Sequence, residues 1–275
     1  MEPKFEEILN AVKKSGYLFE QEVATIFEKL GIHVRTNSAF KDIDEDKSRE
    51  IDIMGFKNYL YDEENKLYIS ARFICECKNN QNPFTFITRN KSKNDDRYIP
   101  PNFTFSKNKY EVPISGESNS YRAYDGFEYF KLKEIFPYSL QDYKAVQFCK
   151  IIPKGKEWIA QHDGIYDSII YPLSKCLEYY KNLDIEQQKK ISTRMFTVYF
   201  PMVVLNSNIY SINSHLDSEI VNEVDYMSFI REIENKKQKG QYLIDFVKKE
   251  SLENYLTNAE SFMQKFLESI KSNMF

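Results

Sequence analysis

Two short stretches decide the fold: REIDIM at residues 49–54, and ICECK at residues 74–78. Side chains of different character alternate along both, as expected of β-strands with one buried face. Each stretch places charge inside an apolar strand, with Asp52 in the first and Glu76 and Lys78 in the second. A charge in an apolar sheet costs free energy unless something balances it. The two strands therefore predict a polar site on one face of a sheet.

Strand geometry sets out that site. Glu76 and Lys78 are two residues apart, so they project from the same face, ~7 Å apart, while Cys75 and Cys77 point into the opposite packing layer. A neighbouring strand ~5 Å away would bring Asp52 close enough to share a divalent cation with Glu76. These two carboxylates, the Cys77 backbone carbonyl and water suit Mg²⁺, with Mn²⁺ as a substitute. Lys78 could orient or deprotonate a water there, because burial near a cation can lower its pKa.

Working outward, the sequence predicts regular elements on both sides of this pair. Apolar residues recur at three- and four-residue steps in residues 18–30, and Gly31 supplies a stop, so a helix of about four turns is expected. The other expected elements are strands at 32–35, 67–77 and 241–247, helices at 141–151 and 165–182, a hairpin of strands 196–205 and 209–212, and a C-terminal helix at 250–273.

Residues 79–139 are rich in Asn, Ser, Pro and aromatic residues and predict an insertion within one domain that spans residues 1–275. Its first part is basic, and Arg89, Lys91, Lys93 and Arg97 are candidates for holding the phosphates of a nucleic acid while aromatic side chains stack on bases. The same pattern equally describes a solvated loop whose aromatic residues pack against the domain.

The order of these motifs resembles the PD-(D/E)XK nuclease superfamily, and within it the type IV restriction enzymes and Holliday-junction resolvases. The resemblance rests on Asp52, on Glu76-x-Lys78 and on the preceding helix sequence GYLFE at residues 16–20. Ile51 stands where the family name has proline. The resemblance implies an α/β fold with a restriction-endonuclease-like core of helix, three strands, helix and strand, in which a mixed central sheet is flanked by helices.

The resemblance also implies roles for individual residues. Asp52 and Glu76 would bind Mg²⁺, Lys78 would act on the attacking water, and Glu20 would line the site as an additional or water-mediated metal contact. Alternatively, Glu20 is simply an acidic residue on the solvent-exposed face of its helix, which also carries Glu22. Either residues 141–151, with Gln147 as a substrate-site candidate, or residues 165–182 would form the second core helix, after an unusually long insertion.

Composition narrows the class of protein. The chain has 275 residues, 42% hydrophobic and 29% charged, which is typical of a soluble globular protein. A net charge of −3 argues against a broadly cationic nucleic-acid binder. Four cysteines and three histidines are too few for a disulfide scaffold and make a structural zinc site improbable. Neither a signal peptide nor a membrane-spanning stretch is recognised, so a cytoplasmic protein is expected.

The function expected from these observations is a Mg²⁺-dependent endonuclease that hydrolyses phosphodiester bonds, with DNA favoured as substrate and host defence or repair as the setting. Two alternatives stay open. The chain could be a non-cleaving subunit that binds nucleic acid or a protein, or it could cut RNA with the same site, because both nucleic acids present the same phosphodiester. A homodimer or a partner subunit could supply further substrate contacts.

Overall fold

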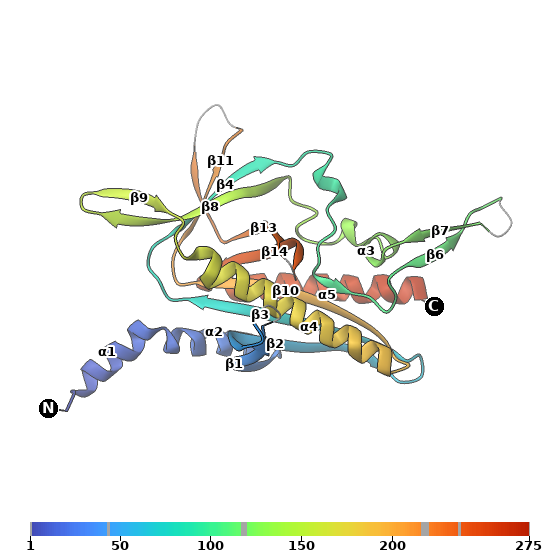
Figure 1. Cartoon of the computed structure of the whole chain (residues 1–275), viewed down its shortest axis with the longest axis horizontal. Coiled ribbons are helices and arrows are strands. Elements are labelled where there is room, and N and C mark those ends of the chain that lie inside the picture. Colours follow the sequence, from blue (N-terminus) through green and yellow to red (C-terminus); the bar gives the residue numbers. More distant parts are fainter. Residues whose placement is uncertain (1, 43–44, 117–119, 216–219, 236–237, 275) are drawn as a thin grey trace.

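A large mixed β-sheet with helices on both faces forms the centre of the protein (Figure 1). The structure is a computed structural model and describes residues 2–42, 45–116, 120–215, 220–235 and 238–274. The expected α/β class, with a mixed sheet flanked by helices, is therefore confirmed. Within the described residues, no helix is both long and apolar enough to cross a membrane.

The N-terminal third builds one edge of the sheet. Helices α1 (Phe5–Ser15) and α2 (Tyr17–Lys29) meet at Gly16, whose φ of +91° lies in the left-handed region that glycine adopts without strain. An antiparallel meander follows, made of β1 (His33–Lys41), β2 (Ser48–Asp62) and β3 (Leu67–Lys78). Helix α1 has no buried residue and extends away from the body (Figure 1).

The remaining elements complete the sheet and its helical layers. In chain order they are β4 (Phe84–Asn90), β5 (Phe103–Thr104), β6 (Tyr110–Pro113), β7 (Tyr121–Tyr124), α3 (Gly126–Tyr129), β8 (Tyr143–Lys154), β9 (Glu157–Gln161), α4 (Tyr171–Lys190), β10 (Arg194–Leu205), β11 (Ile209–Asn213), β12 (Val221–Val224), β13 (Tyr226–Glu234), β14 (Lys239–Lys248) and α5 (Leu252–Met274). Single turns of 3-10 helix lie at Asp95–Arg97, Leu132–Glu134 and Lys249–Ser251, and a π turn at Tyr166–Ile170 leads into α4.

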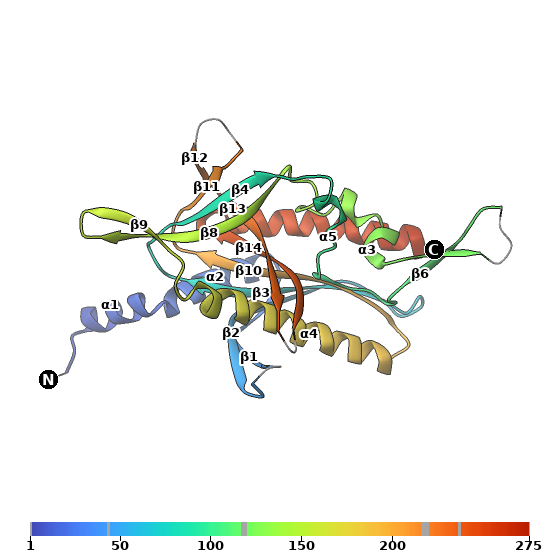
Figure 2. The ribbon, with the colours of Figure 1, turned by 45° about the horizontal axis from the view of Figure 1, so that its top comes forward.

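The strands of the main sheet are ordered β1-β2-β3-β10-β14-β13-β8-β4-β11-β12, with β5 beside β10 and β9 beside β8. Strand β10 lies between β3 and β14 and runs parallel to both. Helix α4 covers one face of the sheet, and α2 and α5 cover the other, as the tilted view shows (Figure 2). This arrangement explains why almost every residue of β10 is buried.

Aromatic side chains dominate the core beneath α2 and α5. Phe73 on β3 stacks on Phe200 of β10 at 4.9 Å between ring centroids, and meets Phe27 of α2 edge-on at 5.7 Å. Phe262 of α5 completes this group against Phe200. Full burial of each such side chain contributes roughly 2 kcal/mol to folding, so this layer holds α2 firmly against the strands that carry the candidate site.

Several predicted elements are confirmed. The helix expected at 18–30 is α2, which ends at Lys29, and residues 50–54 lie in β2 and residues 67–77 in β3. The helix expected at 165–182 is the π turn followed by α4. The strand expected at 241–247 is β14, and the C-terminal helix expected at 250–273 is α5.

Two predictions are wrong. The stretch expected as a helix at 141–151 is instead strand β8 from Tyr143 onward, because Phe148 packs on Phe86 of the neighbouring β4, with ring centroids 5.1 Å apart. The stretches 196–205 and 209–212 are strands, but they do not form a hairpin. Strand β10 pairs with β3 and β14, whereas β11 pairs with β4 and β12.

The segment 79–139 contains more regular structure than its composition suggests. It supplies β4 to the main sheet and the short β5 alongside β10. Its strands β6 and β7 form a separate hairpin that projects from the body near α3 (Figure 1). The segment is thus partly integrated into the sheet and partly an outward projection.

Candidate active site

The candidate site lies where β2 and β3 separate. The two strands pair from Asp62 and Leu67 up to Ile53 and Cys75, and the ladder ends there. Asp52, the next residue on β2, turns its Oδ2 atom to the backbone N–H of Cys77, which donates a hydrogen bond of 2.7 Å. A side-chain hydrogen bond from Asp52 therefore links the two strands where their backbone pairing has ended.

Glu76 and Lys78 lie beside Asp52 on β3. Lys78 Nζ donates a hydrogen bond of 2.7 Å to Glu76 Oε2, and the two side chains are only 22% and 8% exposed. Burial raises the pKa of Glu76 from 4.5 to about 7. Lys78 opposes this rise, while the negative charges of Asp52 and Glu20 add to it. The structure thus brings all four predicted residues into one electrostatic group.

The pKa values of Asp52, Glu20 and Lys78 are raised as well. Burial raises the pKa of Asp52, and the Cys77 hydrogen bond and Lys78 counteract it. Burial and then the charge of Asp52 raise the pKa of Glu20, a partly exposed residue on α2. Burial alone would lower the pKa of Lys78, but the attraction of Glu76 and Asp52 outweighs it and the pKa rises. Lys78 is therefore protonated at neutral pH, contrary to the expectation of a lowered pKa.

A small hydrogen-bond network joins the helix before Glu20 to the strands of the site. Asn79, directly after β3, donates from its side-chain amide to the carbonyl of Lys13 at the end of α1, at 2.9 Å. Asn206, after β10, donates to Asn79 Oδ1 at 2.8 Å, and its backbone N–H donates to the Lys78 carbonyl at 3.1 Å. These bonds tie the ends of β3 and β10 to the end of α1, just before Gly16 and the start of α2.

Cys75 and Cys77 behave as the strand alternation predicts. Both thiols are buried in the core beneath α2 and α5, with their Sγ atoms 4.0 Å apart. The side chain of Cys77 therefore points away from the carboxylates, and only its backbone is available to the site. Its N–H group is engaged by Asp52, and its carbonyl is the predicted cation ligand.

The basic residues predicted to hold phosphates are not part of this cluster. Phe84, at the start of β4, is the end of that strand nearest the cluster, and Arg89 lies five residues farther along, roughly 16 Å at 3.3 Å per residue. The Arg89 side chain donates a hydrogen bond to His215 Nε2. Lys91 donates to the Tyr138 carbonyl and lies 3.9 Å from the centre of its ring. Lys93 and Arg97 are exposed farther along the same segment.

Lys150 on β8 is a cation near the site that the sequence reasoning missed. Burial lowers the pKa of Lys150, and the positive charge of Lys78 lowers it further. Its Nζ atom lies 5.6 Å from the centre of the Phe84 ring, at the start of β4. Nothing in the sequence pattern indicates this proximity, because it depends on β4 and β8 pairing in the sheet. Gln147, the other candidate from this stretch, lines a separate cavity with His162 and Arg231.

The chemistry of the cluster fits a hard divalent cation. Its donors are carboxylate oxygens, which Mg²⁺ prefers, and the carboxylates raise one another's pKa, which a positive charge would reverse. Within the described residues, no three His, Cys, Asp or Glu side chains converge closely enough to hold a metal by themselves. A cation placed here would keep water in part of its coordination sphere, with Asp52 and Glu76 as candidate ligands.

Comparison with known proteins gives no relative for this chain. No protein-family model, no curated protein and no solved structure matches it. What the chain does must therefore be inferred from the geometry and electrostatics of its own residues.

Proposed function

We propose that this protein is a Mg²⁺-dependent endonuclease of the PD-(D/E)XK type that hydrolyses phosphodiester bonds in DNA. The observation that carries the proposal is the electrostatic coupling of Asp52, Glu76 and Glu20 with Lys78 at the end of the β2–β3 ladder. A carboxylate whose pKa is strongly perturbed by burial together with specific charged neighbours, as Glu76 is, is a candidate for a functional site.

The order and pairing of the elements support this assignment. Helix α2, strands β1, β2 and β3, helix α4 and strand β10 follow one another in the order that the resemblance implies, interrupted by the segment between β3 and α4. Strand β10 lies parallel to β3, with Leu205 opposite Lys78. The second core helix is then α4, and residues 141–151 are excluded from that place because they form a strand.

Each side chain has a definite task in this proposal. Asp52, Glu76 and the Cys77 carbonyl would hold Mg²⁺, with Glu20 as an additional contact. The cation would polarise the scissile phosphate and make the attacking water more acidic. Lys78 is protonated, so it donates a hydrogen bond that orients the water and balances the charge that builds up on the phosphate.

Substrate binding would depend on a local positive charge, because the whole chain carries a net charge of −3. Lys78 and Lys150 place two such charges at the site, and Lys150 is free to meet a neighbouring phosphate oxygen without a place in the cation's coordination sphere. We favour DNA on the resemblance, and place the protein in the cytoplasm, in host defence or repair. A second copy of the chain or a partner subunit would extend the contact.

A non-cleaving binding subunit is the competing proposal. The electrostatic cost of the cluster speaks against it. A carboxylate such as Glu76, with its pKa raised to about 7, destabilises the folded state at neutral pH, and a chain without catalysis gains nothing from that cost. The RNA-cleaving alternative retains the same residues and differs only in the substrate.

Cleavage of supercoiled plasmid tests the proposal. Purified protein is incubated with Mg²⁺, Mn²⁺ or EDTA beside Asp52→Asn and Lys78→Ala variants. Glu50→Gln, at an exposed position two residues before Asp52 on β2, serves as the matched control. The proposal expects nicking or linearisation that requires a divalent cation, is lost in the first two variants and is retained in the control. Cleavage of RNA alone would change the substrate, and cleavage of neither, with all variants folded, would favour the binding subunit.

A further inference from the structure

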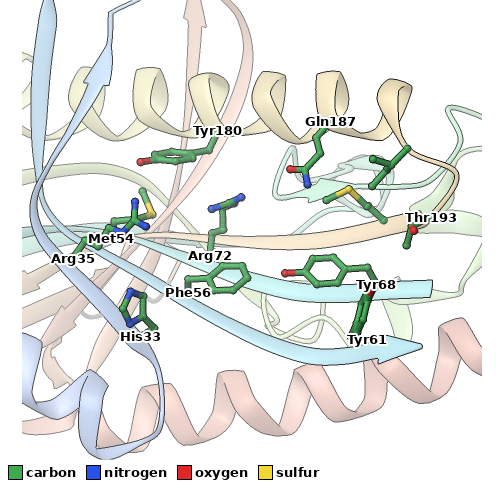
Figure 3. A pocket seen from close by; sticks show the side chains of 12 residues that line it. His33, Arg35, Met54, Phe56, Tyr61, Tyr68, Arg72, Tyr180, Gln187 and Thr193 are labelled. Atoms are coloured by element: carbon green, nitrogen blue, oxygen red, sulfur yellow. The ribbon is translucent and has the colours of Figure 1, made fainter. Parts of the chain in front are cut away.

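A second site lies on the same sheet face as the acidic cluster, toward the other end of the strands. A cavity of about 540 Å³ opens between α4 and strands β1, β2 and β3 (Figure 3). Phe56, which lines it, is four residues along β2 from Asp52, roughly 13 Å away. Met54, which also lines the cavity, is two residues along β2 from Asp52, and buried Ile74 pairs with it under α4. The residues that line the cavity do not include Glu20, Asp52, Glu76 or Lys78. The cavity is thus distinct from the candidate active site.

Aromatic side chains form the walls of this cavity. Tyr180 enters from α4 on one side, and Phe56, Tyr61 and Tyr68 come from β2 and β3 on the other (Figure 3). Tyr61 is 60% exposed, which is high for an aromatic residue at the mouth of a cavity. The Arg72 guanidinium lies between the Phe56 and Tyr180 rings, so the partly exposed rings of Tyr61 and Tyr68 are the ones available to a flat aromatic ligand. Each base that stacks on such a ring contributes about 1–3 kcal/mol to binding.

The charge lining the cavity is positive. His33 and Arg35 project from the edge strand β1, and the described lining residues include no Asp or Glu. Within the described part of the chain, neither His33 nor Arg35 takes part in an ion pair, so both can meet an anion. Both are exposed at the rim, where a charged group of a ligand could retain contact with water.

Arg72, the second arginine that lines the cavity, is held in place by other residues. Arg72 makes two hydrogen bonds to Asp184 of α4, at 3.0 Å and 2.7 Å, and its guanidinium lies 5.4 Å from the Phe56 ring and 5.2 Å from the Tyr180 ring. Tyr199 donates a further 2.6 Å bond to the same carboxylate. This network sets the spacing of α4 and the sheet, so the cavity is built before a ligand arrives.

We propose that this cavity binds a nucleoside phosphate. The base would stack on Tyr68 at the edge of Phe56, because Arg72 occupies the space between Phe56 and Tyr180, and the phosphate would lie at Arg35 and His33 on the rim. Gln187 and Thr193, also in the lining, offer hydrogen-bonding groups to the edge of a base. The volume falls within the range of roughly 300–1,000 Å³ typical of small-molecule sites. The ligand would be either a free nucleotide or one unstacked nucleotide of a single strand.

The proposal does not depend on cleavage, and its test keeps the two separate. Calorimetric titrations of the full chain in EDTA use AMP, adenosine, inorganic phosphate and a short deoxyadenylate single strand as probes. Arg35→Gln removes the rim cation at an exposed position, so the fold is expected to tolerate it. Arg122→Gln, on the exposed β7, is the matched control.

We expect AMP or the single strand to bind more tightly than adenosine and phosphate. Arg35→Gln should weaken that binding about tenfold, the value of one charge-assisted hydrogen bond, and should leave the binding of adenosine unchanged. The control variant Arg122→Gln should bind every probe as the wild type does. Saturation by AMP identifies a free nucleotide, and saturation by the strand alone identifies a nucleic-acid contact. If neither AMP nor the single strand saturates the protein, or if the Arg35→Gln variant binds AMP as tightly as the wild type, the proposal is overturned, whatever the plasmid assay gives.

Discussion

Replacing Glu76 by Gln should make the protein more stable at neutral pH. The folded chain holds the pKa of Glu76 at about 7, against 4.5 for the unperturbed carboxyl. Each tenfold difference in proton affinity is worth about 1.4 kcal/mol, so the ionised carboxylate costs folding about 3 kcal/mol. Gln has the same shape, can still accept the Lys78 hydrogen bond and carries no charge, so the variant should recover most of this free energy.

The sign of the pH dependence follows from the direction of the shift. The folded chain binds the proton more tightly than the unfolded chain, so the stabilising effect of the protonated carboxyl is complete below about pH 4.5 and is lost as the pH rises through about 7. The wild type should therefore lose about 3 kcal/mol over this window relative to the Glu76→Gln variant.

Urea unfolding at pH 5 and pH 8, in EDTA, measures this difference. The variant should gain stability over the wild type mainly at pH 8, whereas Glu50→Gln, at an exposed position, should change by less than about 0.5 kcal/mol at both. Equal stability differences for Glu76→Gln at both pH values would refute the reasoning, since an unperturbed carboxyl is already ionised at pH 5.

Three further predictions test other parts of the structure. Lys150→Ala should weaken DNA binding and reduce the slope of log affinity against log salt by about 1, measured by fluorescence anisotropy, and an unchanged slope would exclude a phosphate contact. Phe73→Ala should cost about 3–5 kcal/mol in urea unfolding, because it leaves a cavity against Phe200; a loss below 1 kcal/mol would contradict the packing described. Asp184→Asn should cost about 3 kcal/mol and lower the melting temperature, since it leaves Arg72 without its buried partner; an unchanged melting temperature would show that the ion pair does not brace the cavity.

Local patterns were sufficient where an element's burial follows from its own sequence. The apolar stripes identified α2 and α5 because one face of each packs on the sheet. Strands β2 and β3 are buried on both faces, and their β-rich apolar runs with the embedded charges identified them. The placement of Asp52, Glu76 and Lys78 was also predictable, since charge inside an apolar strand is rare and needs a compensating environment. These residues lie together as that argument expects.

Local patterns failed where long-range pairing decides the structure. Residues 141–151 form a strand because β4 lies alongside, and no short window of sequence contains that partner. Strand β10 avoids a hairpin with β11 because β3 and β14 flank it on both sides. Lys150 approaches Lys78 for the same reason, and the basic segment at Arg89 points elsewhere because β4 carries it away from the carboxylates.

The central claim is that Asp52, Glu76 and their neighbours form a single divalent-cation site. Titration with Mn²⁺, with the free ion followed by electron paramagnetic resonance, measures this directly in the wild type, in Asp52→Asn and in Glu50→Gln. The account predicts one tight site per chain in the wild type and in Glu50→Gln, and its loss in Asp52→Asn. Equal Mn²⁺ binding by the folded Asp52→Asn variant, or no binding by the wild type, would contradict the claim.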